Sequence, residues 1–178
     1  MKKLAIIFLL TPLAACTTMS GDASRERVAL VDPARGAALL EQCSRTGPDV
    51  SSVEGYFEPS AQDITALETG AMAALARSRD EYRPEQAQYA GDYLAFDWPD
   101  NPGLYVRQYV GYRIAGRRHV YGNFLPVQSG TFPTSEPAIV CDGGPQFFGV
   151  EYDLDAGRLV RIAFNGGLGG PFLDAITP

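Results

Sequence analysis

The sequence predicts an α+β domain in which two N-terminal helices pack on one face of an antiparallel meander sheet of about five strands. Up to about residue 77, apolar side chains recur every three to four residues, which is the period of an amphipathic helix. From Tyr93 onward, short apolar or alternating segments are separated by turns rich in Gly, Pro and Asp. Helices that precede all the strands are typical of segregated layers.

The first helix is predicted between Pro33 and Gly47. Asp32 can cap it, because a carboxylate accepts hydrogen bonds from the first free amides of a helix, and Pro33 suits the first helical position. One face would carry four residues at positions i, i+3, i+4 and i+7, namely Gly36, Leu39, Leu40 and Cys43. Cys43 is therefore expected to face the core.

The second helix is predicted from Ser60 to about Arg77. Ser60 and Asp63 have the spacing of a capping box. The apolar stripe consists of Ile64, Leu67, Ala71, Ala74 and Leu75. Its small alanines would let the helix approach a sheet closely. Residues 79–91 contain Pro84 and have no strong period, so a connecting segment is expected there.

Strand-like segments follow at residues 93–98, 104–114, 118–125, 138–141, 147–152 and 159–164. Ala115 and Gly116 suit the tip of a hairpin between the second and third of these. The run from Asp153 to Gly157 begins like a calcium loop but lacks the closing Glu, so a hairpin turn is favoured. The glycine-rich run 166–170 has no following Lys and is interpreted as part of a loose tail.

The start of the chain resembles a cleavable secretion signal. Lys2 and Lys3 precede seven apolar residues, Leu4 to Leu10, and small residues precede Cys16. Seven helical residues would cover about a third of a hydrocarbon core roughly 30 Å thick, so a permanent transmembrane helix is not expected. The alternative is an ordinary secretory signal that happens to end beside a cysteine.

The sequence Leu13-Ala14-Ala15-Cys16 resembles the lipobox of bacterial lipoproteins. The resemblance implies that residues 1–15 are removed as a signal peptide and that a lipid is attached to Cys16, which anchors the chain to a membrane. Thr17 follows the cysteine, whereas the inner-membrane retention signal of such proteins is Asp. The chain is therefore expected in the cell envelope, anchored to the outer membrane.

Cleavage would leave a lipidated flexible tether at 16–31, a single globular domain at 32–167 and a C-terminal tail at 168–178. Both lysines lie in the removed segment, so 13 Arg and 21 acidic residues would remain, a formal net charge of 13 − 21 = −8. Schiff-base chemistry on a lysine is excluded, and an acidic chain argues against a nucleic-acid partner. No metal or other cofactor is expected.

Cys43 and Cys141 are the thiols that would remain after lipidation. In an oxidising envelope, two such cysteines most simply form a disulfide. A metal site or a reactive thiol is the alternative, but the chain has one histidine, His119, and no C-x-x-C motif. His119 follows Arg117 and Arg118, whose charges oppose its protonation, so a surface position is favoured over a catalytic one.

Tyr and Arg side chains gather on the two strands of the predicted hairpin. The side chains expected to share one exposed face are Tyr105, Arg107, Tyr109 and Arg113 on the first strand and His119, Tyr121 and Asn123 on the second. Such groups are enriched at binding sites, so this Arg/Tyr face is the candidate binding surface. The alternative is that the pairs merely stabilise a half-exposed sheet.

The chain also resembles a family of uncharacterised proteobacterial lipoproteins over roughly residues 36–166. The matching blocks are Cys43-Ser44-Arg45, Arg107-Gln108-Tyr109, Tyr121-Gly122-Asn123-Phe124, Val140-Cys141-Asp142-Gly143-Gly144, Phe148-Gly149-Val150-Glu151-Tyr152 and Phe164-Asn165-Gly166. This resemblance implies no particular activity and no catalytic residue. Its two cysteine blocks match Cys43 and Cys141 and favour the disulfide.

The expected function is that of a non-catalytic module of the cell envelope, which binds a protein, a glycan or a small ligand through the Arg/Tyr face. The sequence contains no motif of a serine hydrolase, a zinc protease or a dinucleotide-binding site. Two alternatives stay open. One is a cell-envelope hydrolase that uses paired carboxylates, and the other is a structural envelope protein.

Overall fold

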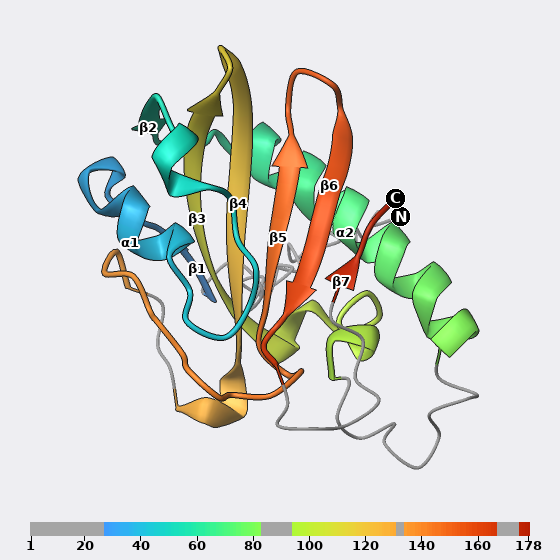
Figure 1. Ribbon diagram of the computed structural model, residues 1–178. Coiled ribbons are helices and arrows are strands. Elements are labelled where there is room, and N and C mark those ends of the chain that lie inside the picture. The colour runs from blue at the N-terminus through green and yellow to red at the C-terminus, as the bar shows by residue number, and fades with distance from the viewer. Residues whose placement is uncertain (1–26, 83–93, 131–133, 167–174) are drawn as a thin grey trace, which may run out of the picture.

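The structure, a computed structural model, describes residues 27–82, 94–130, 134–166 and 175–178 (Figure 1). It has mixed α/β content around one mostly antiparallel sheet of seven strands. The strand order is β1-β3-β4-β5-β6-β7, and β2 also pairs with β3. The predicted combination of helices with a mostly antiparallel sheet is confirmed.

The centre of the sheet is a meander of four strands: β3 (Tyr105–Ile114), β4 (Arg117–Pro126), β5 (Phe148–Asp153) and β6 (Arg158–Phe164). The hairpin between β3 and β4 turns at Ala115 and Gly116, as predicted, and both have positive φ. A two-residue turn of this kind matches the natural twist of a β-hairpin. Short strands form the edges: β1 (Val28–Leu30) and β2 (Gly55–Phe57) on β3, and β7 (Ala175–Ile176) on β6.

Helix α2 (Ala61–Tyr82) covers one face of the sheet and is drawn in green behind it in Figure 1. The predicted capping box is present, because the Ser60 amide donates to Asp63 Oδ2 at 2.9 Å and the Asp63 amide donates to Ser60 Oγ at 3.2 Å. The helix packs Leu67, Ala71, Ala74 and Leu75 against an aromatic cluster that contains Trp98, Phe124 and Phe148. The alanine stripe permits this close packing, as expected.

Helix α1 (Gly36–Leu40) lies on the opposite face of the sheet, in blue in front of it in Figure 1. Its buried Leu39 and Leu40 pack with Val110, Tyr112 and Tyr121. The expectation that both helices share one face is therefore wrong. The first helix is also shorter than predicted, because the backbone leaves the helical conformation at Glu41, and the chain then crosses the sheet in irregular form.

Several predicted boundaries also change. Residues 138–141 form no strand, and the segment predicted at 93–98 contains a 3-10 turn at Leu94–Asp97 instead of a strand. Val28–Leu30 of the expected tether and Ala175–Ile176 of the expected tail both pair with the sheet. Across the described ranges, no helix is long and apolar enough to cross a membrane.

Candidate functional site

The expected Arg/Tyr face does not form. Tyr105, Arg107 and Tyr109 point toward α2 and are buried, with 0%, 3% and 0% of their surface exposed. Arg113 is exposed, and its guanidinium lies 5.6 Å from the centre of the Phe57 ring. These residues of β3 do not offer a common surface to a ligand.

The three predicted residues of β4 lie on the other face of the sheet. The two-residue turn pairs Ile114 with Arg117, so each odd-numbered residue of β3 faces an even-numbered residue of β4. Tyr121 and Asn123 are consequently opposite Val110 and Gln108 rather than beside Tyr105, Arg107 and Tyr109. Tyr121 and Asn123 are 1% exposed, so they are buried too. The placement predicted for the binding residues is corrected on both strands.

Arg107 and Tyr109 hold α2 against the sheet through one carboxylate. Arg107 Nη1 donates to Glu68 Oε1 at 2.7 Å, and the Tyr109 hydroxyl donates to the same oxygen at 2.6 Å. Burial raises the pKa of Tyr109, and the charge of Glu68 raises it further. These groups are used in packing, and their polar atoms face helix α2 instead of solvent.

His119 lies at the hairpin end of the sheet. Its ring stacks on Tyr112 with centroids 5.2 Å apart, and burial lowers its pKa. Its two neighbouring arginines form ion pairs, Arg117 with Asp153 and Arg118 with Asp155. Within the described ranges, no group of three or more His, Cys, Asp or Glu could hold a metal ion. The run from Asp153 to Gly157 is the turn between β5 and β6, as predicted.

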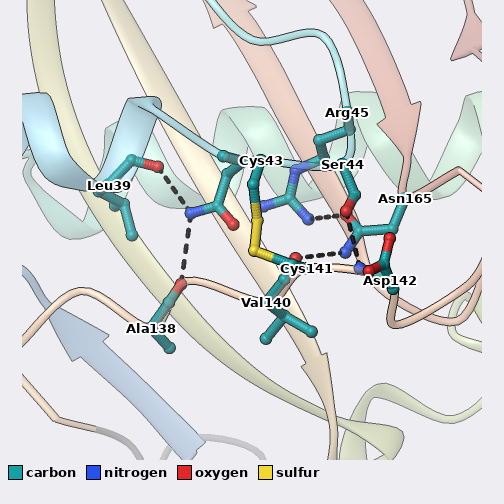
Figure 2. The surroundings of a disulfide bond; sticks show 10 residues. Leu39, Cys43, Ser44, Arg45, Ala138, Val140, Cys141, Asp142 and Asn165 are labelled. Atoms are coloured by element: carbon teal, nitrogen blue, oxygen red, sulfur yellow. Dashed lines mark hydrogen bonds between the residues drawn. A yellow bond between two sulfur atoms is a disulfide. The ribbon is translucent and has the colours of Figure 1, made fainter.

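Cys43 and Cys141 lie at disulfide distance, with Cα atoms 5.4 Å apart, so the predicted pairing is confirmed. Figure 2 shows the bond joining the segment after α1 to an irregular segment of the chain, residues 134–147, that lies over the same face. We call residues 134–147 the strap. Both cysteines are exposed to solvent. The prediction that Cys43 faces the core is wrong, because α1 ends before it.

A buried arginine lies beside the disulfide. Arg45 is 9% exposed and donates from Nε to the Tyr121 hydroxyl at 3.0 Å, from Nη1 to Asn165 Oδ1 at 2.8 Å and from Nη2 to Asn123 Oδ1. No carboxylate of the described residues lies within 4.0 Å of it. We call Arg45, Gln108, Tyr121, Asn123 and Asn165 the polar hub. Sequence reasoning missed this hub, although Gln108 interrupts the apolar side of β3.

A groove of 530 Å³ opens between α2 and the β6–β7 edge of the sheet. Four buried side chains with apolar surface line it, namely Ala74, Tyr152, Leu159 and Ile176. Exposed Arg77, Arg158 and Glu81 also line it. In the described part of the chain, neither arginine has a carboxylate within 4.0 Å. The groove was not predicted, since it depends on how α2 lies across the sheet.

The buried carboxylates lie away from this groove. Glu151 is paired with Arg161, and Asp153 with Arg117. Burial raises the pKa of Glu151, which Arg161 partly offsets. A second cavity of 490 Å³ is lined by Asp63 and Arg118, but Arg118 is already paired with Asp155. Among the described lining residues, neither cavity contains a pair of buried carboxylates.

No family model matches the chain, and no curated protein or solved structure matches it either. The family resemblance of the sequence blocks stays a prediction. Cys16 lies outside the described residues, so its lipidation stays a prediction as well.

Proposed function

We propose that this chain is a lipid-anchored protein of the cell envelope, whose domain is a non-catalytic module that binds an anionic amphiphile in the groove between α2 and β6–β7. The pattern Leu13-Ala14-Ala15-Cys16 supports the anchor and the outer-membrane location. The groove supports the binding role. The amphiphile would be a small molecule with an apolar chain and a carboxylate or phosphate head.

The observation that carries this proposal is an apolar floor combined with two arginines that have no carboxylate partner among the described residues. Tyr152, Leu159 and Ile176 offer apolar surface to a hydrocarbon chain, and burial of such surface contributes about 25 cal/mol per Å². Arg77 and Arg158 are available to an anionic head, since their guanidinium groups lack carboxylate partners in the described residues. Among the charged side chains that line the groove, two are cationic and one, Glu81, is anionic, so the side chains carry one positive charge in excess.

This cationic excess is distinctive in an acidic chain, whose formal net charge is −6 before any cleavage. Three other arginines, which flank the β3–β4 turn, already have partners. Arg117 and Arg118 form ion pairs, and the guanidinium of Arg113 lies over the Phe57 ring. Within the described residues, the groove therefore combines two guanidinium groups that lack carboxylate partners with an apolar floor. The hydrolase alternative has no such support, because buried Glu151 and Asp153 lie outside the groove and are paired with arginines.

The binding test uses the mature chain from residue 16 with Cys16→Ala, titrated with a dansyl-labelled undecanoic acid. Saturable fluorescence enhancement is expected. Arg77→Ala with Arg158→Ala should weaken binding about ten-fold or more, because loss of charge-assisted hydrogen bonds worth about 1.5–3 kcal/mol exceeds a factor of ten. The methyl ester of the probe, which keeps the chain but lacks the anion, should bind about as weakly to the unsubstituted protein.

The matched control is Arg35→Ala with Arg113→Ala, which removes the same charge from exposed positions that do not line the groove. It should leave affinity within about two-fold, since well-separated exposed charges are screened. Equal loss in both double variants would contradict a specific role for the groove. Saturation by a peptide or a glycan, but not by the amphiphile, would instead favour the other partner classes.

The anchor is tested separately in intact cells. Cys16→Ala should abolish incorporation of labelled palmitate and move the protein from the membrane to the soluble fraction, because a lipid chain contributes about 0.8 kcal/mol per buried CH₂. Continued membrane association of the unlabelled variant would show that membrane localisation does not depend on Cys16.

A further inference from the structure

The Cys43–Cys141 bond joins two residues that lie 98 positions apart in the sequence. Both cysteines are exposed, whereas Arg45, two residues from Cys43, is buried. Thiol–disulfide exchange requires that an attacking thiolate reach one sulfur, so accessibility decides which disulfides are reducible in the folded state. The exposed position leaves this bond open to such a reagent.

The strap that Cys141 belongs to is not part of either apolar cluster of the domain. None of the strap residues packs in the clusters beneath α2 or beneath α1. Ile139, its large aliphatic residue, is 51% exposed. Pro145 is the one strap residue that is buried, so release of the strap would cost little apolar burial, which is the largest favourable contribution to folding.

Polar side chains fasten the strap instead. Gln108 Nε2 donates to the carbonyl oxygens of Thr134 and Glu136 at 3.0 and 2.7 Å. Its Oε1 accepts from the amide of Ala138 at 2.9 Å. Further contacts run from Asn123 Nδ2 to Ala138 O, from Asn165 Nδ2 to Val140 O and from the Asp142 amide to Ser44 Oγ.

Two of these contacts, from Asn165 Nδ2 to Val140 O and from the Asp142 amide to Ser44 Oγ, are drawn beside the disulfide in Figure 2. Water can replace each of them, because net protein hydrogen bonds contribute only about 0.5–1.5 kcal/mol. The disulfide is thus the one covalent contact that keeps the described strap on the polar hub.

We propose that the Cys43–Cys141 disulfide is a site of thiol–disulfide exchange, and that its reduction by a dithiol releases the strap from the polar hub while α2 and the meander stay folded. One thiolate of the dithiol attacks a cysteine sulfur, the Sγ–Sγ bond breaks, and the other cysteine leaves as a thiolate. The second thiol of the reagent then attacks the mixed disulfide and frees the remaining cysteine. Two electrons and two protons pass from the dithiol to the cysteine pair.

Release would uncover Gln108, Asn123 and the guanidinium of Arg45. The donors and acceptors of this hub are satisfied by one another and by strap carbonyls in the oxidised protein. Solvent would take the place of the strap at these atoms. The device therefore changes the polarity of one sheet face without exposing the aromatic cluster on the other.

The test treats the mature Cys16→Ala chain with dithiothreitol in native buffer and follows free thiols together with amide hydrogen exchange. Two thiols should appear without denaturant. Amides of residues 134–147 should then exchange about ten-fold faster or more, as expected when a segment opens locally, while those of β3 to β6 stay within about two-fold. Oxidised glutathione should restore the original protection.

Three results would overturn the proposal. These are the titration of thiols only in denaturant, strap protection that is unchanged after reduction, and loss of protection in all segments together. Cys43→Ser with Cys141→Ser should reproduce the reduced state, and Ser44→Ala, which removes one strap contact but keeps the disulfide, should show a smaller effect. Reduction of the protein with both cysteines intact decides the matter if the double variant does not fold.

Discussion

Arg45 is a charged side chain held in the interior by neutral oxygens. Its three acceptors come from β4 and from the residue after β6, so one guanidinium joins two strands to the segment that follows α1. A buried cation is costly unless its donors are satisfied, and the planar fork of arginine suits several acceptors at once. The positions of the three acceptor oxygens around the Arg45 guanidinium are therefore tightly constrained.

A substitution at Gly149 can test how tightly the polar hub is packed. A Cβ placed on it would overlap the hydroxyl of Tyr121 and lie 2.9 Å from Arg45 Nε. We expect Gly149→Ala to lower the free energy of unfolding by about 1–3 kcal/mol, as overpacking does, measured by urea denaturation. Gly55→Ala is the matched control, since nothing lies within 4 Å of its Cβ position. If both substitutions changed the free energy of unfolding equally, the side chains of the polar hub would be able to move aside at little cost.

His119 gives a pH dependence with a definite sign. Burial lowers its pKa below the ordinary 6.5, an effect that Asp153 opposes and Arg117 reinforces. Below pH 6.5 the unfolded chain therefore binds the proton more readily than the folded protein. The contribution of His119 to stability is complete above this pH and is lost as the pH falls toward the folded pKa.

We expect His119→Gln to flatten this fall, measured as urea midpoints between about pH 5 and 8. Asp153 and Asp155 face the same region, but their pKa values are lowered from 3.8, so they titrate below this range. The raised pKa of Glu151 gives the opposite slope and is present in both proteins. Identical pH profiles would refute the role of His119.

At the scale of elements, α2 is attached to the sheet by both apolar and ionic contacts. Its apolar stripe was predictable because its period and capping box are local features of the sequence. The contact of Glu68 with Arg107 and Tyr109 was not, since it requires knowing which face of β3 lies under the helix. Arg107 and Tyr109, which were expected on an exposed face, are buried, and Glu68 is half-buried against them.

Glu68→Ala should therefore destabilise the protein by about 3 kcal/mol, because removal of one partner leaves the buried Arg107 charge without this carboxylate. Thermal or urea unfolding measures the change. Asp80→Ala on the same helix is the control, since Asp80 is exposed and lies 3.9 Å from Arg79. Its effect should stay within about 1 kcal/mol. A comparable loss in both variants would argue against an ionic attachment.

At the scale of the molecule, the mostly antiparallel sheet, the hairpin tip and the cysteine pair were predictable from local patterns. The binding face was not, for two physical reasons. The two-residue turn at Ala115 and Gly116 reverses residue parity across the hairpin, so residues of like parity lie on opposite faces. Moreover, eight consecutive residues of β3 are buried, because both faces of the sheet are covered. Alternation cannot distinguish inside from outside in such a strand.

The disulfide should also stabilise the whole molecule. Closing a loop of nearly a hundred residues removes chain entropy worth about 4 to 5 kcal/mol from the unfolded state, less if the bond is strained. Cys43→Ser with Cys141→Ser should lower the free energy of unfolding by up to this amount in urea titrations, while the protein stays folded in buffer. A change below about 0.5 kcal/mol would mean that the unfolded chain is already compact there.

The pairing of β1 with β3 has a consequence for the order of folding. Leu30 aligns with Tyr109, which is 79 positions later, whereas Ile114 aligns with Arg117. Contacts of large sequence separation form late because loop closure must come first. The N-terminal third emerges first during synthesis and yet has no strand to join until β3 is made. A nascent chain that ends before residue 105 should therefore stay unfolded, and the meander should serve as the template on which the earlier residues later assemble.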